Sequence, residues 1–316
     1  MGRDRFDYLE IEGRPRRQVT APRPVAVYAP QPTELHLRVQ ESFGEFGHEP
    51  DQLNSPGAVA VDHLGSLYIA DSYNHRILRL DRERQLFILG SYGTARGKLL
   101  NPQGIAVDRT LAMYVAEQGT HRVQKFDAGG RLLFCFGRRG KSPGQFDSPT
   151  GIAVDKFHNF YVADVGNSRI QSFTADGLYR FSVGASQIGA VRFSKPQGVA
   201  VDDDGFVYVA DTLNHRVVKL DPSGREVLAF GSHGSGKNEM VEPRDVAVDG
   251  SGRIWVVEPD NNRLHAFDAV GDSLMTFTGD TPEVGGLAAP SGVAVFNGSL
   301  YLADTLHHRV LKIAYA

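Results

Sequence analysis

The sequence has few of the features that mark a disulfide framework, a membrane span or a polyanion-binding surface. One of its 316 residues is cysteine, Cys135, so no intrachain disulfide can form. No run approaches ~18 apolar residues and the first residues lack the apolar core of a signal peptide, so we predict neither a membrane span nor a signal peptide. The formal net charge of −3 does not favour wrapping a nucleic acid. We therefore expect a soluble cytoplasmic protein in a reducing compartment.

The sequence repeats itself six times. Segments close to the pattern Pro-x-Gly-x-Ala-Val-Asp recur, with one departure each in units one, five and six, and their prolines are Pro56, Pro102, Pro149, Pro196, Pro243 and Pro290. Successive prolines are 46 residues apart once and 47 residues apart four times. Each unit continues with a run such as "VYVAD", a polar turn, a run such as "RVVKLD" and a fourth such as "EVLAFG". Such runs are typical of strands, and their repetition predicts an all-β fold, a six-bladed β-propeller of four-stranded antiparallel blades.

The two ends of the chain predict how the ring closes. The sixth unit ends after its third run, "RVLKI". Residues 35–45 have the same spacing to Pro56 as the fourth strand of another unit has to Pro149. We predict that this N-terminal strand completes the last blade and covers edges that an open ring would expose. The expected organisation is an extended Pro/Arg-rich arm at residues 1–34 and a propeller at residues 35–316.

The repeated segments resemble a known family. "SPTGIAVD", "FYVAD" and "DTLNHR" are similar to NHL repeats, and the resemblance extends over roughly residues 35–314. It implies a six-bladed propeller that works as a binding platform for proteins or, in some members, for RNA.

An acid and an arginine five residues later flank the turn between the second and third strands. The pairs are Asp71 and Arg76, Glu117 and Arg122, Asp164 and Arg169, Asp211 and Arg216, Glu258 and Arg263, and Asp304 and Arg309. A catalytic site need not be copied six times, so we interpret the pairs as hairpin locks. Histidines in these turns, such as His215, lie too far apart to share a metal ion. We interpret them as surface variants and predict no metal and no cofactor.

The residue after each repeated proline differs from unit to unit. These residues are Gly57, Gln103, Thr150, Gln197, Arg244 and Ser291, and we expect them to ring one mouth of the central channel. We predict ligand or partner contacts at five of them and at the next residue of unit five, namely Gln103, Thr150, Gln197, Arg244, Asp245 and Ser291. Arg244 and Asp245 could bind an anionic or polar ligand, but we favour a structural ion pair, because such pairs also arise structurally.

The same positions test an enzymatic alternative. Propellers of the NHL type are similar to peptidyl-hydroxyglycine amidating lyases, which place zinc-binding histidines after these prolines, and none of the six residues here is histidine. A calcium lactonase would need several carboxylates in the channel, where Asp245 alone qualifies. No nucleophile-elbow, zinc-protease or nucleotide motif is present. We predict no catalytic residue, and a hydrolase or lyase at the channel mouth remains the alternative.

Two basic segments complete the candidate surfaces. The arm carries Arg14, Arg16 and Arg17 among prolines, a composition that favours an extended chain, and we predict that it docks on another protein. An interblade loop carries Arg138, Arg139 and Lys141 on the same end as the arginine-containing turns. We predict a non-enzymatic interaction platform, or accessory subunit of a multiprotein complex, with no obligate small molecule. RNA is the less favoured partner, because no aromatic stacking series accompanies the charge.

Overall fold

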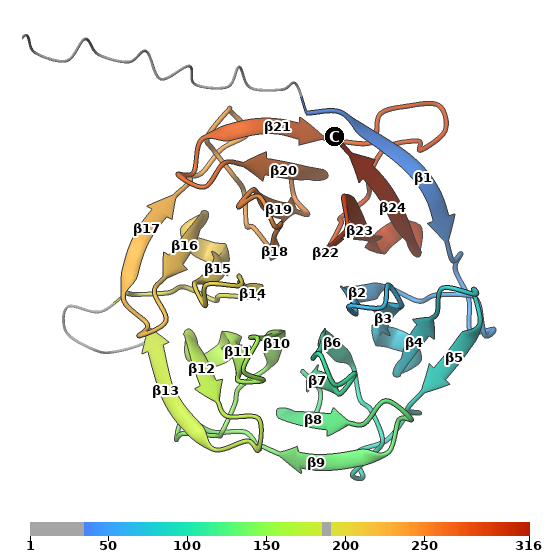
Figure 1. The fold of residues 1–316 in the computed structure, drawn as a ribbon, viewed down its shortest axis with the longest axis vertical. Helices are drawn as coiled ribbons and strands as arrows, with labels where there is room; N and C mark the ends of the chain where they lie inside the picture. Colours follow the sequence, from blue (N-terminus) through green and yellow to red (C-terminus); the bar gives the residue numbers. More distant parts are fainter. Residues whose placement is uncertain (1–34, 185–190) are drawn as a thin grey trace, which may run out of the picture. The chain divides into compact units, whose positions relative to one another are not determined.

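The propeller is seen in a computed structural model that describes residues 35–184 and 191–316. The described chain forms six four-stranded antiparallel sheets arranged in a ring around a central channel (Figure 1). In each sheet the first strand lies nearest the channel and the fourth lies at the rim. The predicted fold class is therefore confirmed. The predicted arm, residues 1–34, lies outside the described residues.

The blades follow one another along the chain, and the last blade takes its outermost strand from the N-terminal end of the propeller. Blade one consists of β2 (Pro56–Val61), β3 (Leu67–Asp71), β4 (Arg76–Leu80) and β5 (Leu86–Leu89). Blade two consists of β6 (Pro102–Val107), β7 (Met113–Glu117), β8 (Arg122–Phe126) and β9 (Leu132–Phe136). Blade three consists of β10 (Pro149–Val154), β11 (Phe160–Asp164), β12 (Arg169–Phe173) and β13 (Tyr179–Gly184).

The remaining blades have the same order of strands. Blade four consists of β14 (Val199–Val201), β15 (Val207–Asp211), β16 (Arg216–Leu220) and β17 (Glu226–Phe230). Blade five consists of β18 (Asp245–Val248), β19 (Ile254–Glu258), β20 (Arg263–Phe267) and β21 (Ser273–Phe277). Blade six consists of β22 (Gly292–Phe296), β23 (Ser299–Asp304), β24 (Arg309–Tyr315) and β1 (Leu37–Phe43). Short 3-10 helices occupy four of the turns, namely η1 (Ser72–Asn74), η2 (Val165–Asn167), η3 (Thr212–Asn214) and η4 (Thr305–His307).

Each second strand is buried on both faces because it is packed between two neighbouring blades. In β11, Phe160 and Val162 join an apolar cluster with blade two. The alternate residues Tyr161 and Ala163 join a separate cluster with blade four. This two-residue alternation is the ordinary geometry of a strand, and here it supplies the core between blades.

The N-terminal strand closes the ring as predicted. β1 pairs antiparallel with β24, from Leu37 opposite Tyr315 to Phe43 opposite Val310. Blade six therefore joins residues from both ends of the propeller into one sheet (Figure 1). The pairing covers the outer edge of β24, which would otherwise present unpaired backbone groups.

The described residues are almost entirely strand and turn. Within residues 35–184 and 191–316, no helix has the length and apolar character that a membrane crossing requires.

Candidate functional site

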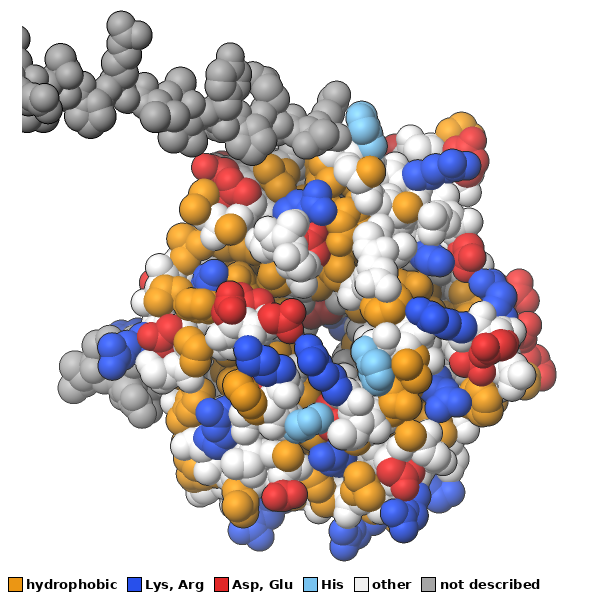
Figure 2. All heavy atoms as spheres, in the orientation of Figure 1, with side chains coloured by type: hydrophobic (Ala, Val, Ile, Leu, Met, Phe, Trp, Pro, Cys, Tyr) orange, Lys and Arg blue, Asp and Glu red, His pale blue; other side chains and the backbone are white. Residues whose placement is uncertain are grey.

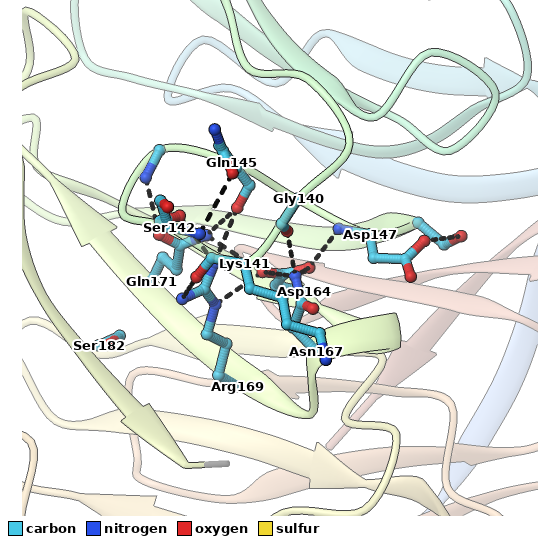
Figure 3. Close-up of polar contacts among 12 residues, drawn as sticks. Gly140, Lys141, Ser142, Gln145, Asp147, Asp164, Asn167, Arg169, Gln171 and Ser182 are labelled. Carbon is cyan, nitrogen blue, oxygen red and sulfur yellow. Dashed lines mark hydrogen bonds and ion pairs between the residues drawn. The ribbon is translucent and has the colours of Figure 1, made fainter. Parts of the chain in front are cut away.

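The acid of each turn is buried and joined to the loop that enters its blade. In blade three the fully buried Asp164 carboxylate accepts hydrogen bonds from Arg169 Nε at 2.7 Å and from the backbone N–H of Asp147 at 2.7 Å (Figure 3). Asn167 Nδ2 donates another at 2.9 Å. A buried carboxylate is tolerated when its lone pairs are satisfied in this way. The carboxylate therefore has a structural role.

The arginine of the pair fastens the preceding interblade loop. The remaining guanidinium nitrogens of Arg169 donate to three loop carbonyl oxygens (Figure 3), those of Lys141 at 2.7 Å, Ser142 at 3.1 Å and Gln145 at 2.8 Å. The corresponding acid–arginine pairs of all six blades have N–O distances of 2.7–2.8 Å. The predicted hairpin lock is confirmed, and it also fixes the loop between blades.

The residue before the arginine links each blade to the next. His75 adopts the left-handed conformation with φ of 56°, and its Nδ1 accepts a hydrogen bond from the backbone N–H of Asn101 at 3.0 Å. We call this bond the interblade latch. The other five acceptors are the side chains of His121, Ser168, His215, Asn262 and His308. The interpretation of His215 as a surface variant is wrong: the position requires a hydrogen-bond acceptor, which histidine, serine and asparagine all provide.

The latch sets the protonation state of its histidines. Nδ1 can accept a hydrogen bond only when it carries no proton. Burial lowers the pKa of His75 and of His308 below the usual range, which favours this neutral form. Each of these rings bonds the backbone of its own neighbouring blade, so the rings do not converge on a point. Across the described residues, no three His, Cys, Asp or Glu side chains are grouped closely enough to hold a metal ion.

The six inner strands line a channel of about 250 Å³. The six residues that follow the prolines all contribute to its lining, and Asp245 does as well. Three of these side chains are engaged by the protein itself. Gln103 Nε2 donates to Asn101 Oδ1 at 2.8 Å, Thr150 Oγ1 to the carbonyl of Gln197 at 2.8 Å, and Ser291 Oγ to the carbonyl of Pro56 at 3.0 Å. Ligand contacts at these positions remain a prediction.

Arg244 and Asp245 do not form the ion pair that we favoured from the sequence. Their side chains lie beyond ion-pair distance, and the half-buried Arg244 guanidinium makes neither a hydrogen bond nor an ion pair with any described residue. The reason lies in strand geometry, because successive side chains point in different directions. The Asp245 carboxylate instead accepts a hydrogen bond from the backbone N–H of Val293 in blade six, at 2.9 Å.

Asp245 occupies a place that is a glycine in four of the other blades. A Cβ added at Gly151 would lie 2.4 Å from the carbonyl oxygen of Gln197 in the next blade, so a side chain does not fit there. In blade five the inner strand β18 starts at Asp245 itself, and the carboxyl group bridges to blade six. Burial raises the pKa of Asp245 to about 7. Among the described residues that line the channel, Asp245 supplies the one carboxyl group, and its pKa lies well above the usual range of an aspartate.

The predicted basic residues lie away from the channel lining. Arg138, Arg139 and Lys141 are exposed on the loop before blade three, and Arg139 Nε lies 3.6 Å from Asp147 Oδ1. This loop and the turns with the locks share one side of the ring, which we call the turn face. The predicted arm residues Arg14, Arg16 and Arg17 lie outside the described residues.

The turn face also carries exposed apolar side chains that sequence reasoning missed. We call four of them the apolar arc: Phe46, Tyr73, Tyr92 and Leu306, which are 60–71% exposed. Phe46 packs against the latch residue His308 with ring centroids 4.7 Å apart, and Tyr92 packs against His75 at 5.0 Å. The arc therefore follows blades six and one. Tyr73 and Leu306 occupy one equivalent turn position, and variation at that position, which is Gly119 in blade two, was the signal that could have found them.

Charge of both signs borders the central hollow as well. Figure 2 shows basic, acidic and histidine side chains gathered around it on the face displayed. On the side opposite the turn face, Arg109 of blade two and Asp203 of blade four approach to 3.7 Å across the ring, although both side chains are largely exposed. Such an exposed pair contributes little to stability.

Comparisons with known proteins agree with this architecture. The sequence model of the NHL repeat matches residues 53–80, 146–173 and 193–220, each of which spans the first three strands of a blade. No curated protein sequence matches the chain. Solved structures with a similar fold include a streptogramin B lyase, with 13% identity, a TM-score of 0.61 and coverage of 89% of this chain and 98% of that one.

Two further solved structures widen the range of functions found on this fold. A gluconolactonase from Xanthomonas campestris has 15% identity and a TM-score of 0.64, covering 88% of this chain and 99% of that one. Hydrazine synthase from Kuenenia stuttgartiensis has 19% identity and a TM-score of 0.57, covering 84% of this chain and 78% of that one. At these identities the likeness establishes the fold alone, because one fold hosts many functions.

Proposed function

We propose that this six-bladed propeller, three blades of which match the NHL repeat, is a non-enzymatic platform that binds another protein on its turn face. The apolar arc is the observation that carries this proposal. Large apolar side chains that are exposed together on a rigid surface are typical of protein interfaces. The locks and latches hold the arc rigidly, which reduces the entropy lost on binding.

The partner that fits best presents apolar anchor side chains and acidic residues. The apolar arc would receive the anchors. The exposed Arg138 and Lys141, which pair with no acid among the residues described, would attract the acids. Complementary charge of this kind steers association and fixes orientation. A partner segment that crosses from blades six and one toward blade three would use both surfaces.

The channel supports this choice over a hydrolase or lyase. The streptogramin B lyase and the gluconolactonase are enzymes with a similar fold, so the enzymatic alternative has a structural precedent. General acid–base chemistry needs titratable groups that converge on one reacting atom. The channel lining offers one carboxyl group, Asp245, and no imidazole among the residues described.

The arc can be tested by co-purification from an extract of the native host. The full chain, the double variant Phe46→Ser/Tyr92→Ser and the control Phe157→Ser would be compared by quantitative mass spectrometry. Phe157 is 68% exposed but lies in a turn on the opposite side of the ring, so it matches the arc in chemistry but not in place. We expect the arc variant to lose a protein that the other two retain.

Two outcomes would contradict the proposal. Retention of every partner by the arc variant would remove the arc as an interface. Loss of the captured material after ribonuclease treatment would instead identify an RNA-binding propeller, the alternative that basic loops and exposed rings also allow.

The N-terminal arm is the second part of the proposal. Its arginines and prolines suit an extended segment that lies along a partner. Deleting residues 2–32 should leave the thermal unfolding of the propeller unchanged and abolish co-purification of the partner. Unchanged co-purification would show that the arm does not dock.

A further inference from the structure

The channel has two polar side chains at blades four and five that the protein leaves unpaired. Gln197 and Arg244 both follow a repeated proline and both line the channel. Within the described chain, neither the Gln197 amide nor the Arg244 guanidinium has a hydrogen-bond partner. The equivalent Gln103 and Thr150 are engaged by the protein. This contrast sets one sector of the channel apart from the rest.

An unpaired guanidinium in a narrow channel points to an anion. Partial burial lowers the pKa of Arg244, yet arginine stays charged at neutral pH. Removing part of its hydration without a partner is costly, and a bound anion would offset that cost. The planar fork of N–H groups matches a carboxylate in bidentate geometry.

We infer that the central channel binds a small carboxylate, held by the Arg244 guanidinium with a further hydrogen bond from the Gln197 amide. A monoanion balances the single charge of Arg244, whereas a phosphate monoester with roughly two charges exceeds it. The channel volume of about 250 Å³ lies below the ~300–1,000 Å³ typical of drug-sized ligands, so the occupant is small. The inner strands are edge strands whose free backbone groups suit a polar ligand. This site does not depend on the docking role of the apolar arc.

Asp245 makes binding dependent on pH. Its carboxyl group accepts hydrogen bonds from the backbone N–H groups of Val293 on β22 and of Val246 on β18, and it lies beside Gly198 at the start of blade four. The charged group nearest in sequence is Arg244, whose positive charge lowers the pKa of Asp245 and partly opposes the effect of burial. Because burial raises the pKa of Asp245 to about 7, the ionised fraction of its carboxyl group increases as the pH rises from 6 to 8. The ionised form adds a negative charge beside the site and repels an anion. Carboxylate affinity should therefore fall as the pH rises from 6 to 8.

Ligand-detected NMR with the full chain tests the site directly. Acetate, lactate and inorganic phosphate would each be titrated at pH 6 and pH 8. We expect the carboxylates to bind more tightly than phosphate at pH 8, where phosphate is mainly a dianion. Their affinity should fall at least tenfold in Arg244→Gln and by less in Arg244→Lys. Gln197→Ala should weaken binding, whereas the control Gln103→Ala, whose wild-type amide is already bonded to Asn101, should not.

A short peptide with one glutamate, blocked at both ends, distinguishes the source of the carboxylate. Binding of the free acids indicates a small metabolite, and binding of the peptide alone indicates an acidic side chain of a partner; both support the site. Asp245→Asn should bind carboxylates equally at pH 6 and pH 8. Equal affinity of Arg244→Gln and wild type, or tighter binding of phosphate than of carboxylates at pH 8, or no binding of either source, would overturn the inference.

Discussion

The lock at Asp164 and the start of blade five contain the same types of group in opposite states. At the lock, an arginine and an acid are buried, mutually bonded and joined to a loop, and the arrangement recurs in every blade. At the start of blade five, Arg244 and Asp245 occur once, their charges are not paired, and the guanidinium faces an open channel. Repetition here indicates a structural role, and departure from the repeat indicates a surface that is free to bind.

Removal of β1, the strand that joins the two ends of the propeller, should reduce stability the most. Deleting residues 2–43 removes β1 and leaves the outer edge of β24 unpaired. It also uncovers the blade-six core, against which Leu37 and Val39 pack. We expect loss of cooperative thermal unfolding, followed by circular dichroism. Deleting residues 2–32 is the matched control, and equal melting temperatures for the two deletions would contradict the closure.

A single lock should account for several kcal/mol. Asp164→Ala leaves the buried Arg169 guanidinium without its carboxylate, and breaking a buried pair typically costs about 3–5 kcal/mol. Urea unfolding would measure this loss. The control Asp203→Ala removes an exposed carboxylate that lies 3.7 Å from Arg109 and should change stability very little. A similar loss of unfolding free energy in both variants would show that the buried pair contributes no more to stability than an exposed one.

Asp245 should give a smaller effect with a distinct pH signature. Its folded pKa is raised to about 7, so its contribution to stability is complete below its usual pKa and is lost as the pH rises through 7. Asn at this position keeps an acceptor for the Val293 N–H but cannot ionise. Between pH 5 and pH 8, the unfolding free energy of Asp245→Asn relative to wild type should therefore increase by roughly 1–3 kcal/mol, as measured by urea unfolding. If the difference in unfolding free energy between the two proteins does not change with pH, Asp245 is not a buried carboxyl group that titrates in this range.

The interblade latch should give the smallest effect. The folded pKa of His75 and of His308 is lowered, so their contribution is present above the usual pKa of histidine and is lost as the pH falls through the folded pKa. Each latch should contribute about 1 kcal/mol. The chain already uses Asn262 as an acceptor, so His75→Asn/His308→Asn should keep the latches and lose less stability than wild type between pH 7 and pH 5. An unchanged acid sensitivity in the double variant would argue against the latch.

The blades could be predicted well from the sequence because their pattern is repeated. Six copies of one pattern removed the ambiguity that a single copy would leave. The spacing before Pro56 also predicted that β1 belongs to the last blade, where it pairs with β24. The locks could be predicted for the same reason. The carboxyl group of Asp164 and the guanidinium of Arg169 lie on strands that face each other across one short turn.

Contacts between blades could not be predicted in the same way. The latch joins His215 to the backbone of Glu242, 27 residues away, and nothing in the turn sequence reports where the next blade lies. Arg244 and Asp245 are adjacent in sequence and both line the channel, but Asp245 accepts a hydrogen bond from blade six whereas Arg244 has no partner among the described residues. The apolar arc depends on loop geometry that fixes the exposure of Phe46 and Tyr92.

The unfolding free energies of two variants test whether positions shared by all blades stabilise the propeller while positions that differ between blades are free to bind. Asp164→Ala and Arg244→Gln would be measured by urea unfolding at pH 7, each against wild type. We expect a loss of about 3–5 kcal/mol for Asp164→Ala and a change within about 0.5 kcal/mol for Arg244→Gln. A loss for Arg244→Gln as large as that for Asp164→Ala would contradict this expectation, because Arg244 would then be part of the frame.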